Sequence, residues 1–186
     1  MIITIARECG SGGHAIGVAL AQHYGIKCFD RHILVSEAKK QGLYDELEGF
    51  FSEKPMDSLL YSIAVNHGRN NNNAILERFQ KLITEESFVL IGRCGNYIYG
   101  NQPDCTTLFI HADMENKIQR TIRKQNIDRI KAVELMEYVD SKRQAFHKHY
   151  TGESWGDARN YQLAINSSIL GVEKTAAEII GFIDKK

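Results

Sequence analysis

The sequence predicts an α/β fold built on a parallel sheet. Two observations carry this prediction: five short apolar stretches alternate with segments of helical periodicity, and the first stretch ends in a glycine cluster that opens a helix. The chain has 186 residues, of which 43% are hydrophobic and 25% are charged. This length and composition suit one compact domain of about 100–200 residues with a substantial core.

The amino-terminal segment predicts a β-α-β unit. Residues 1–7 are apolar and β-branched, and this expected strand stops at the glycine cluster 10–13. The next segment has apolar residues at helical spacing and ends at Gly25. A short apolar stretch at 26–29 predicts the second strand, and a helical pattern follows through about Lys40.

The rest of the chain repeats the alternation after a long polar stretch. Residues 42–86 have a helical pattern and predict an inserted helical segment. The expected elements after it are strands at 87–92 and 106–112, a charged helical region at 113–150 with a hinge near 126–128, a strand at 161–166 and a closing helix from about Gly171. Because parallel sheets bind ligands beyond the carboxyl ends of their strands, we expect the functional residues at that edge.

Charge and composition exclude several classes of protein. The 23 Lys and Arg residues balance 23 Asp and Glu residues, whereas a binder of a nucleic-acid polymer normally carries a basic excess. No apolar run approaches the roughly 18 residues that cross a bilayer. The amino terminus lacks the basic region of a signal peptide, so we expect a cytoplasmic protein. The four cysteines show no metal-ligand spacing, and we expect reduced thiols and no protein-bound metal.

The glycine cluster predicts a phosphate-binding turn. A glycine-rich turn that enters a helix points backbone N–H groups outward at the positive end of the helix dipole. Compared with the nucleoside-triphosphate pattern GxxxxGK[ST], however, Gly13 takes the place of the lysine, and the hydroxyl residue of the pattern is missing. The glycines also match the dinucleotide pattern GxGxx[GA], with Asp30 near a ribose-binding position. Turn glycines also occur for conformational reasons alone, so these interpretations stay open here.

Three segments of the chain resemble the cytidylate kinase-like family, which is similar to bacterial cytidylate kinases among the P-loop nucleoside-monophosphate kinases. The segments are ITIARECGSGGHAIGVALAQHYGIKCFDR, VLIGRCGNYIYG and VDSKRQAFHKHYTGESWGDARNYQLAINSSILGVE. The resemblance implies a three-layer P-loop kinase fold, in which helices flank a five-stranded parallel sheet. It also implies one domain over 1–186, with a helical acceptor-side insertion at 42–86 and a helical lid at 113–160.

The resemblance further implies which residues bind the substrates. The implied set is Gly10, Ser11, Gly12, Gly13 and His14 at the phosphates of ATP, Asp30, Arg31, Arg93 and Asp140 at the acceptor, and Asn166 at the donor base. Arg93 lies in a GRC segment where cytidylate kinases have GRD, so Cys94 replaces the acid. A planar guanidinium suits a phosphate that must be oriented. The alternatives are a surface histidine at 14, a surface ion pair at 30–31 and a helix-start salt bridge at 93.

Three arginines fall in the implied lid. Arg120 and Arg123 share one helix face, as Asp140 and Arg143 do on the next helix. The resemblance implies that Arg120, Arg123 and Arg143 stabilise the transferring phosphoryl group while the lid excludes water. The alternative is that these arginines are ordinary solvated charges on the outside of helices. A charged helix exterior also explains the histidines and lysines at 142–149. Met136 stands where a further arginine is expected, which weakens pyrimidine specificity. We expect Trp155 and Tyr161 to pack in the lid or core, and the alternative is that they are base-stacking surfaces.

The expected reaction is transfer of the γ-phosphoryl group of ATP, with Mg²⁺, to a nucleoside monophosphate such as CMP or dCMP. The cation lost with the lysine would come from Arg7, His14 or a lid arginine, and Arg69 and Arg78 in the insertion are further candidates for the acceptor site. One alternative is a nucleotide-binding sensor or partner-binding module without transfer activity, because fold does not dictate function. A dinucleotide-binding oxidoreductase is the other. The sequence predicts nucleotide partners and leaves the oligomeric state open.

Overall fold

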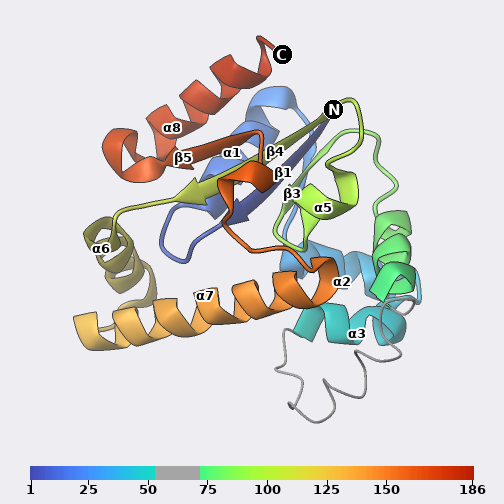
Figure 1. The fold of residues 1–186 in the computed structure, drawn as a ribbon, viewed down its shortest axis with the longest axis horizontal. Helices are drawn as coiled ribbons and strands as arrows, with labels where there is room; N and C mark the ends of the chain where they lie inside the picture. The colour runs from blue at the N-terminus through green and yellow to red at the C-terminus, as the bar shows by residue number, and fades with distance from the viewer. Residues whose placement is uncertain (53–71) are drawn as a thin grey trace.

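Five parallel strands form the centre of the molecule (Figure 1). The computed structural model describes residues 1–52 and 72–186. Its strands are β1 (Ile2–Arg7), β2 (Lys27–Phe29), β3 (Phe88–Ile91), β4 (Cys105–His111) and β5 (Leu163–Asn166). Their order is β2-β3-β1-β4-β5, and Ile3 of β1 pairs with Val89 on one side and Thr106 on the other. The predicted five-stranded parallel sheet is therefore confirmed, with β1 at its centre.

The strand order also separates the two nucleotide-binding alternatives. In dinucleotide-binding folds of this class, the second strand lies beside the first. Here β3 stands between β1 and β2, and β2 forms an edge of the sheet. The topology therefore argues against the dinucleotide-binding alternative.

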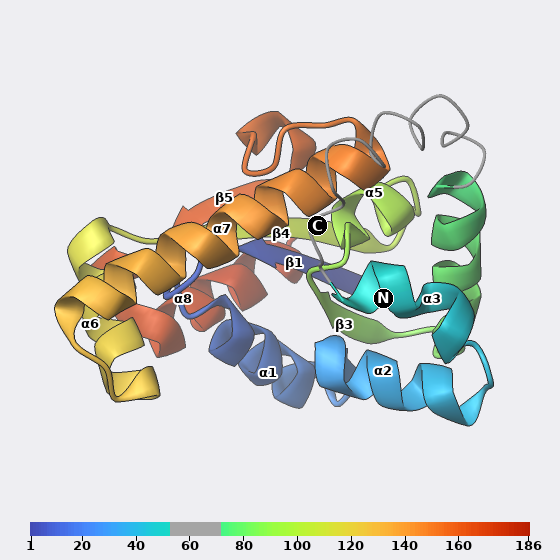
Figure 2. The same ribbon diagram turned by 90° about the horizontal axis from the view of Figure 1, so that it is seen from below.

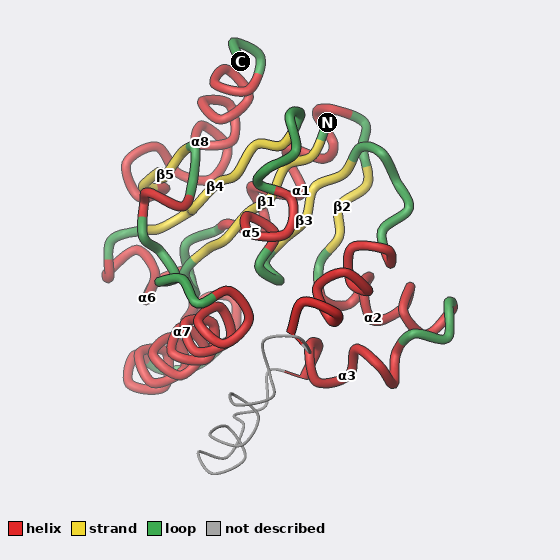
Figure 3. Tube along the Cα trace, turned by 45° about the vertical axis from the view of Figure 1, so that its right-hand side comes forward, coloured by secondary structure: helices red, strands yellow, loops and turns green. Residues whose placement is uncertain are grey.

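Helices cover both faces of the sheet (Figures 2 and 3). Their bounds are α1 (Gly13–Tyr24), α2 (Arg31–Lys40), α3 (Tyr44–Ser52), helical residues 72–82, α5 (Gly95–Tyr99), α6 (Met114–Gln125), α7 (Arg129–Thr151) and α8 (Ser167–Ile183). Alternate residues of a strand point to opposite faces, so Ile3 and Ile5 pack with α1 and α8. Phe88 and Leu90 pack in a second cluster with residues of α2, α3 and α5. The result is the expected three-layer arrangement.

Two element boundaries near the carboxyl terminus differ from the sequence prediction. β5 begins at Leu163 and not at residue 161, because a 3-10 turn (Ala158–Asn160) precedes it and the N–H of Tyr161 bonds to the Ala158 carbonyl at 3.2 Å. α8 begins at Ser167, because the Asn166 side chain caps it by accepting from the Ser168 N–H. Gly171, the expected start, is instead a kink with φ 75° and ψ 174°.

The long helix α7 lies across the carboxyl ends of the central strands (Figure 1). The predicted hinge before it is confirmed: α6 ends at Gln125, Asn126 is left-handed with φ 53°, and the Asp128 side chain caps α7. Met136 is only 3% exposed and packs in the small core between α6 and α7. The residue that replaces the expected arginine is therefore a core residue.

The insertion packs beside the edge strand β2. The rings of Phe50 in α3 and Phe79 lie 4.8 Å apart between centroids, and Phe50 also contacts Phe146 and Tyr150 of α7. Arg69 lies outside the described residues. The roles of 42–86 as an acceptor-side insertion and of 113–160 as a lid stay predictions. None of the helices in the described ranges is long and apolar enough to cross a membrane.

Candidate phosphate-binding site

The glycine turn joins β1 to α1 through two left-handed residues. Gly10 has φ 76° and Gly12 has φ 83°. A Cβ on Gly10 would lie 2.7 Å from the Lys117 carbonyl oxygen, so glycine is required there by both backbone and packing. Gly12 occupies the N-cap of α1 and has no side chain to cap it, and the Ser11 hydroxyl accepts from the Gly13 N–H at 3.4 Å. The positive end of the α1 dipole at this turn suits an anion.

An acidic residue of α7 holds the start of this turn. Both Asp140 carboxylate oxygens accept from the Cys9 N–H, at 2.8 and 3.1 Å. Arg143 donates through Nη1 to Asp140 at 3.1 Å and to the Arg7 carbonyl oxygen at 3.0 Å. Burial raises the pKa of Asp140, although the Cys9 N–H and Arg143 oppose that shift. Asp140 and Arg143 thus fix α7 to the end of β1 and the glycine turn.

Arg120 holds the other end of the turn. Its Nη1 donates to the Ser11 carbonyl at 3.1 Å and to the Ser167 hydroxyl at 2.9 Å, and its Nη2 donates to the Ser167 carbonyl at 3.1 Å. Burial lowers the pKa of Arg120, and the charge of nearby Arg123 adds to this shift. The expected lid arginine is therefore a clamp between the turn, α6 and the start of α8.

A cavity of about 640 Å³ opens at the glycine turn. Its lining includes Gly10, Gly12, Gly13 and His14 of the turn and Asp30 from the end of β2. Asp30 caps α2 by accepting from the His32 and Ile33 N–H groups, and it lies 3.1 Å from His14 Nε2. Burial opposes the ionisation of Asp30, but hydrogen bonds from Ile33 and His14 hold its pKa below the usual value. Asp30 thus pairs with His14 rather than with Arg31.

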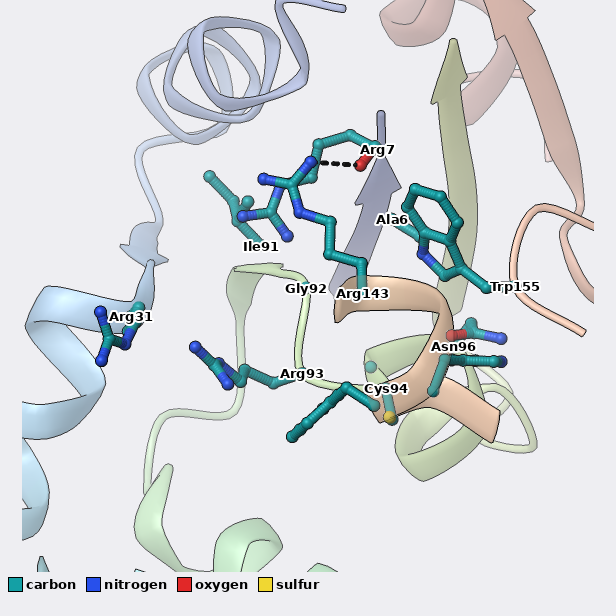
Figure 4. A pocket seen from close by; sticks show the side chains of 13 residues that line it. Ala6, Arg7, Arg31, Ile91, Gly92, Arg93, Cys94, Asn96, Arg143 and Trp155 are labelled. Atoms are coloured by element: carbon teal, nitrogen blue, oxygen red, sulfur yellow. Dashed lines mark hydrogen bonds between the residues drawn. The ribbon is translucent and has the colours of Figure 1, made fainter. Parts of the chain in front are cut away.

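A second cavity of about 210 Å³ adjoins the first (Figure 4). Four arginine side chains line it: Arg7, Arg31, Arg93 and Arg143. Of its thirteen lining residues, none is an aspartate or a glutamate. Like charges gathered in a partly buried space repel one another, and a bound anion relieves that repulsion. The composition of this cavity therefore favours an anionic ligand.

The insertion helix α3 orients two of these arginines. Arg93 is 6% exposed and left-handed with φ 57°, and its Nη1 donates to the Phe50 carbonyl at 2.8 Å. Its guanidinium carbon lies 5.3 Å from the centre of the Phe146 ring. Arg31 donates through Nε to the Phe51 carbonyl at 2.9 Å. The last turn of α3 thus positions both side chains at the small cavity.

Sequence reasoning missed two residues of the small cavity. His147, expected on a charged helix exterior, is 3% exposed and lines the cavity, so that expectation is wrong. Its position four residues after Arg143 is the signal that both face the same way on α7. Asn96, 9% exposed, also lines the cavity and was not singled out. Trp155 combines both expectations, because it lines the cavity and packs edge-on against Phe109.

Several expected site residues lie elsewhere. Arg123 is exposed, donates to the Gln119 carbonyl and lines neither cavity. Asn166 caps α8 and donates to the Asp113 carboxylate at 2.8 Å. Arg78 pairs with Glu46. Cys94, by contrast, lines the small cavity beside Arg93 with φ 56°, and burial raises the pKa of its thiol.

Comparisons with known proteins agree with this geometry. Residues 2–169 match the cytidylate kinase-like family. A cytidylate kinase from Staphylothermus marinus is 27% identical over 190 residues, which cover 100% of this chain and 97% of the relative.

Solved structures extend the comparison. An uncharacterized protein from Eubacterium ventriosum superposes with a TM-score of 0.75 at 28% identity, covering 100% of this chain and 99% of the other. A gluconokinase from Sinorhizobium meliloti, with a TM-score of 0.53 at 14% identity over 98% and 91% of the two chains, shares the fold alone. Because the family match extends over nearly the whole chain, the protein belongs to the cytidylate kinase-like family and has the fold of the P-loop kinases.

Proposed function

We propose that the protein transfers the γ-phosphoryl group of ATP to a nucleoside monophosphate, with CMP and dCMP as the first acceptors to test. One observation carries the proposal: a helix start at a glycine turn adjoins a cavity that four arginines and no carboxylate line. The first feature suits the donor phosphates and the second suits the acceptor phosphate. Relatives named cytidylate kinase support the same assignment.

On this proposal, Arg31, Arg93 and Arg143 bind the acceptor phosphate, and backbone N–H groups of the glycine turn bind the donor phosphates at the start of α1. An oxygen of the acceptor phosphate attacks the γ-phosphorus, and the bond from that phosphorus to the departing ADP oxygen breaks. Catalysis then rests on in-line positioning and on cations that stabilise the spread negative charge. No side chain of the protein needs to form a covalent intermediate.

Magnesium enters such a reaction with the nucleotide, bound to its phosphates. Across residues 1–52 and 72–186, no group of three or more His, Cys, Asp or Glu side chains is arranged to hold a metal ion. Asp140 bonds to the Cys9 N–H. Glu8 and Asp30 line the larger cavity, Glu8 paired with Lys117 and Asp30 with His14, and we assign these two carboxylates to the hydration shell of the magnesium nucleotide.

The base of the acceptor would be read by the remaining residues of the small cavity. The Asn96 amide offers both a donor and an acceptor to a base edge, and the Trp155 ring offers a stacking surface. Cys94 and Met136 take the places of an acid and an arginine that the resemblance associates with cytidylate kinases. We therefore assign the choice of base to Asn96 and Trp155.

The test is a coupled assay with magnesium ATP over CMP, dCMP, UMP, AMP and GMP. We expect transfer to at least one acceptor, and a fall in kcat/KM of about a hundredfold or more in Arg31→Ala and Arg93→Ala, because each removes a charged phosphate contact. Arg31 is exposed, so its variant should fold even if Arg93→Ala does not. Arg159→Ala, an exposed arginine outside both cavities, is the matched control. A folded protein that phosphorylates none of the five acceptors contradicts the proposal.

A nucleotide-binding sensor is the second candidate, and one observation favours it. The turn lacks the phosphate lysine, whose position Gly13 occupies, and the hydroxyl residue that follows this lysine in the pattern, where His14 stands. Such a protein would bind nucleotides without turnover. Calorimetric binding of ATP and CMP, combined with no transfer in the assay above, would select the sensor.

A further inference from the structure

We propose that Arg7 is the cation that binds the donor phosphates in place of the missing loop lysine, an inference that rests on the proposed function. In P-loop proteins, the lysine follows the last glycine of the turn and reaches the terminal phosphates. Here Gly13 occupies that position, and Arg7 occupies the position of the first glycine of the pattern. Two residues of the turn therefore depart from the pattern together.

Packing explains why the two departures occur together. Gly13 is the first residue of α1 and has no positive φ, so its backbone does not require glycine. A Cβ built on Gly13 would lie 2.5 Å from Arg7 Cβ and 2.9 Å from Arg7 Cγ. The stem of Arg7 thus fills the volume that a side chain at 13 would need. A lysine at 13 and an arginine at 7 therefore exclude each other. With Gly13 and Arg7, the cation reaches the turn from the end of β1 and not from the start of α1.

The side chain of Arg7 places its guanidinium where the two cavities meet. Its stem passes Gly13, and its guanidinium contacts Gly92 in the turn after β3. Arg7 lines both cavities, and Figure 4 shows its side chain beside that of Arg143. Arg143 is paired with Asp140 and fixes the Arg7 backbone by donating to its carbonyl oxygen. The phosphoryl group must pass this junction on its way from donor to acceptor.

The other cations considered for this role are directed elsewhere. The His14 imidazole bonds to Asp30 and is exposed. Arg120 directs its donors to the Ser11 and Ser167 groups that it clamps. Arg123 is absent from the lining of both cavities. Arg7 is the candidate whose placement suits the donor phosphates.

The experiment exchanges the two positions. Inorganic tripolyphosphate, which carries the donor's phosphate chain without a base, is titrated calorimetrically into wild type, Arg7→Gly, Gly13→Lys and the double variant. We expect Arg7→Gly to bind about ten- to hundredfold more weakly, because one charged contact is lost. Gly13→Lys should also bind more weakly, because its stem clashes with Arg7. The double variant, which restores the first glycine and the lysine of the pattern, should recover most of the lost affinity.

Three results would overturn the assignment: no binding of tripolyphosphate by wild type, unchanged binding by a folded Arg7→Gly, or a double variant that binds no better than Arg7→Gly. Arg7→Gln, which keeps most of the stem without the charge, replaces Arg7→Gly if melting shows that the glycine variant does not fold. Arg159→Gly is the control and should bind like wild type. The binding experiment does not depend on turnover. If the double variant recovers tripolyphosphate binding while no monophosphate is phosphorylated, the assignment of Arg7 holds and the proposed reaction fails.

Discussion

His147 makes the stability of the protein depend on pH in a calculable way. Its side chain is 3% exposed, and burial lowers its pKa from 6.5 to about 4. The unfolded chain therefore takes up a proton at a higher pH than the folded protein does. The contribution of His147 to the free energy of unfolding is therefore fully present above pH 6.5, and it is lost as the pH falls toward the folded pKa. From these two pKa values, acidification from about pH 7.5 to about pH 5 costs about 2 kcal/mol.

The perturbation is His147→Gln, which keeps a polar side chain but cannot titrate. Urea unfolding is followed by circular dichroism at both pH values, for wild type and variant. All other groups titrate alike in the two proteins, so the difference between the two losses isolates His147. We expect the variant to lose about 2 kcal/mol less than wild type on acidification. His23→Gln, which removes an exposed histidine of α1, should lose as much as wild type.

The expected loss of stability also depends on Glu153, the acidic neighbour of His147. The nearest carboxylate oxygen, on Glu153, lies 3.7 Å from His147 Nε2, beyond an ordinary hydrogen bond. A closer approach on protonation would reduce the loss, because a paired buried charge is less unfavourable. Titration of the His147 ring protons by NMR gives the folded pKa directly. An equal loss of stability in wild type and His147→Gln, with a ring pKa near 6.5, would refute the argument.

Three further changes test the glycine turn and its supports. Gly10→Ala should lose about 1–3 kcal/mol in unfolding, more than Gly152→Ala, because both have positive φ but only Gly10 also meets a backbone oxygen; equal losses would count against the packing argument. Arg120→Ala should lower the melting temperature and weaken tripolyphosphate binding more than Ser167→Ala does, since it removes the clamp from both sides; wild-type values for both quantities would count against a clamp. Asn166→Ala should lose about 1 kcal/mol and Asn166→Ser much less, because serine also caps helices; equal losses would mean that the cap is not what Asn166 contributes.

The fold was predictable from the sequence because its signals are local. The apolar strand 1–7, the glycine turn and the helix after it follow one another within one segment, and the helix ends where Gly25 adopts φ 65°. The last strand and helix were predicted too, but their starting residues were wrong, because the structure there depends on distant partners. The N–H of Gln162 bonds to the Thr107 carbonyl, and that pairing, together with the 3-10 turn, fixes where β5 begins.

The residues of the candidate site could be predicted from the sequence, but the contacts that each of them makes could not. The resemblance picked out Arg31, Arg93 and Arg143, which line one cavity. It did not predict that Arg120 clamps the turn, because the partners of Arg120 are backbone and hydroxyl groups about 110 and 47 residues away in sequence. Such contacts carry no residue signature. His147 was missed for another reason. A histidine between lysines suggests a solvent-exposed position unless it is known which face of α7 is buried.

The arrangement of the arginines bears on how a P-loop fold can dispense with its lysine. Arg7, Arg31 and Arg143 line both cavities, so positive charge is concentrated at their junction rather than at the tip of the turn. Transfer between two phosphates must bring like charges together, and cations at the meeting point offset that repulsion more directly than a cation on the donor side alone. A guanidinium offers five N–H donors in one plane, so it can also contact oxygens of two phosphates at once. The exchange of Lys for Gly at 13 and of Gly for Arg at 7 is therefore compatible with transfer chemistry, so the missing lysine does not by itself decide in favour of the sensor.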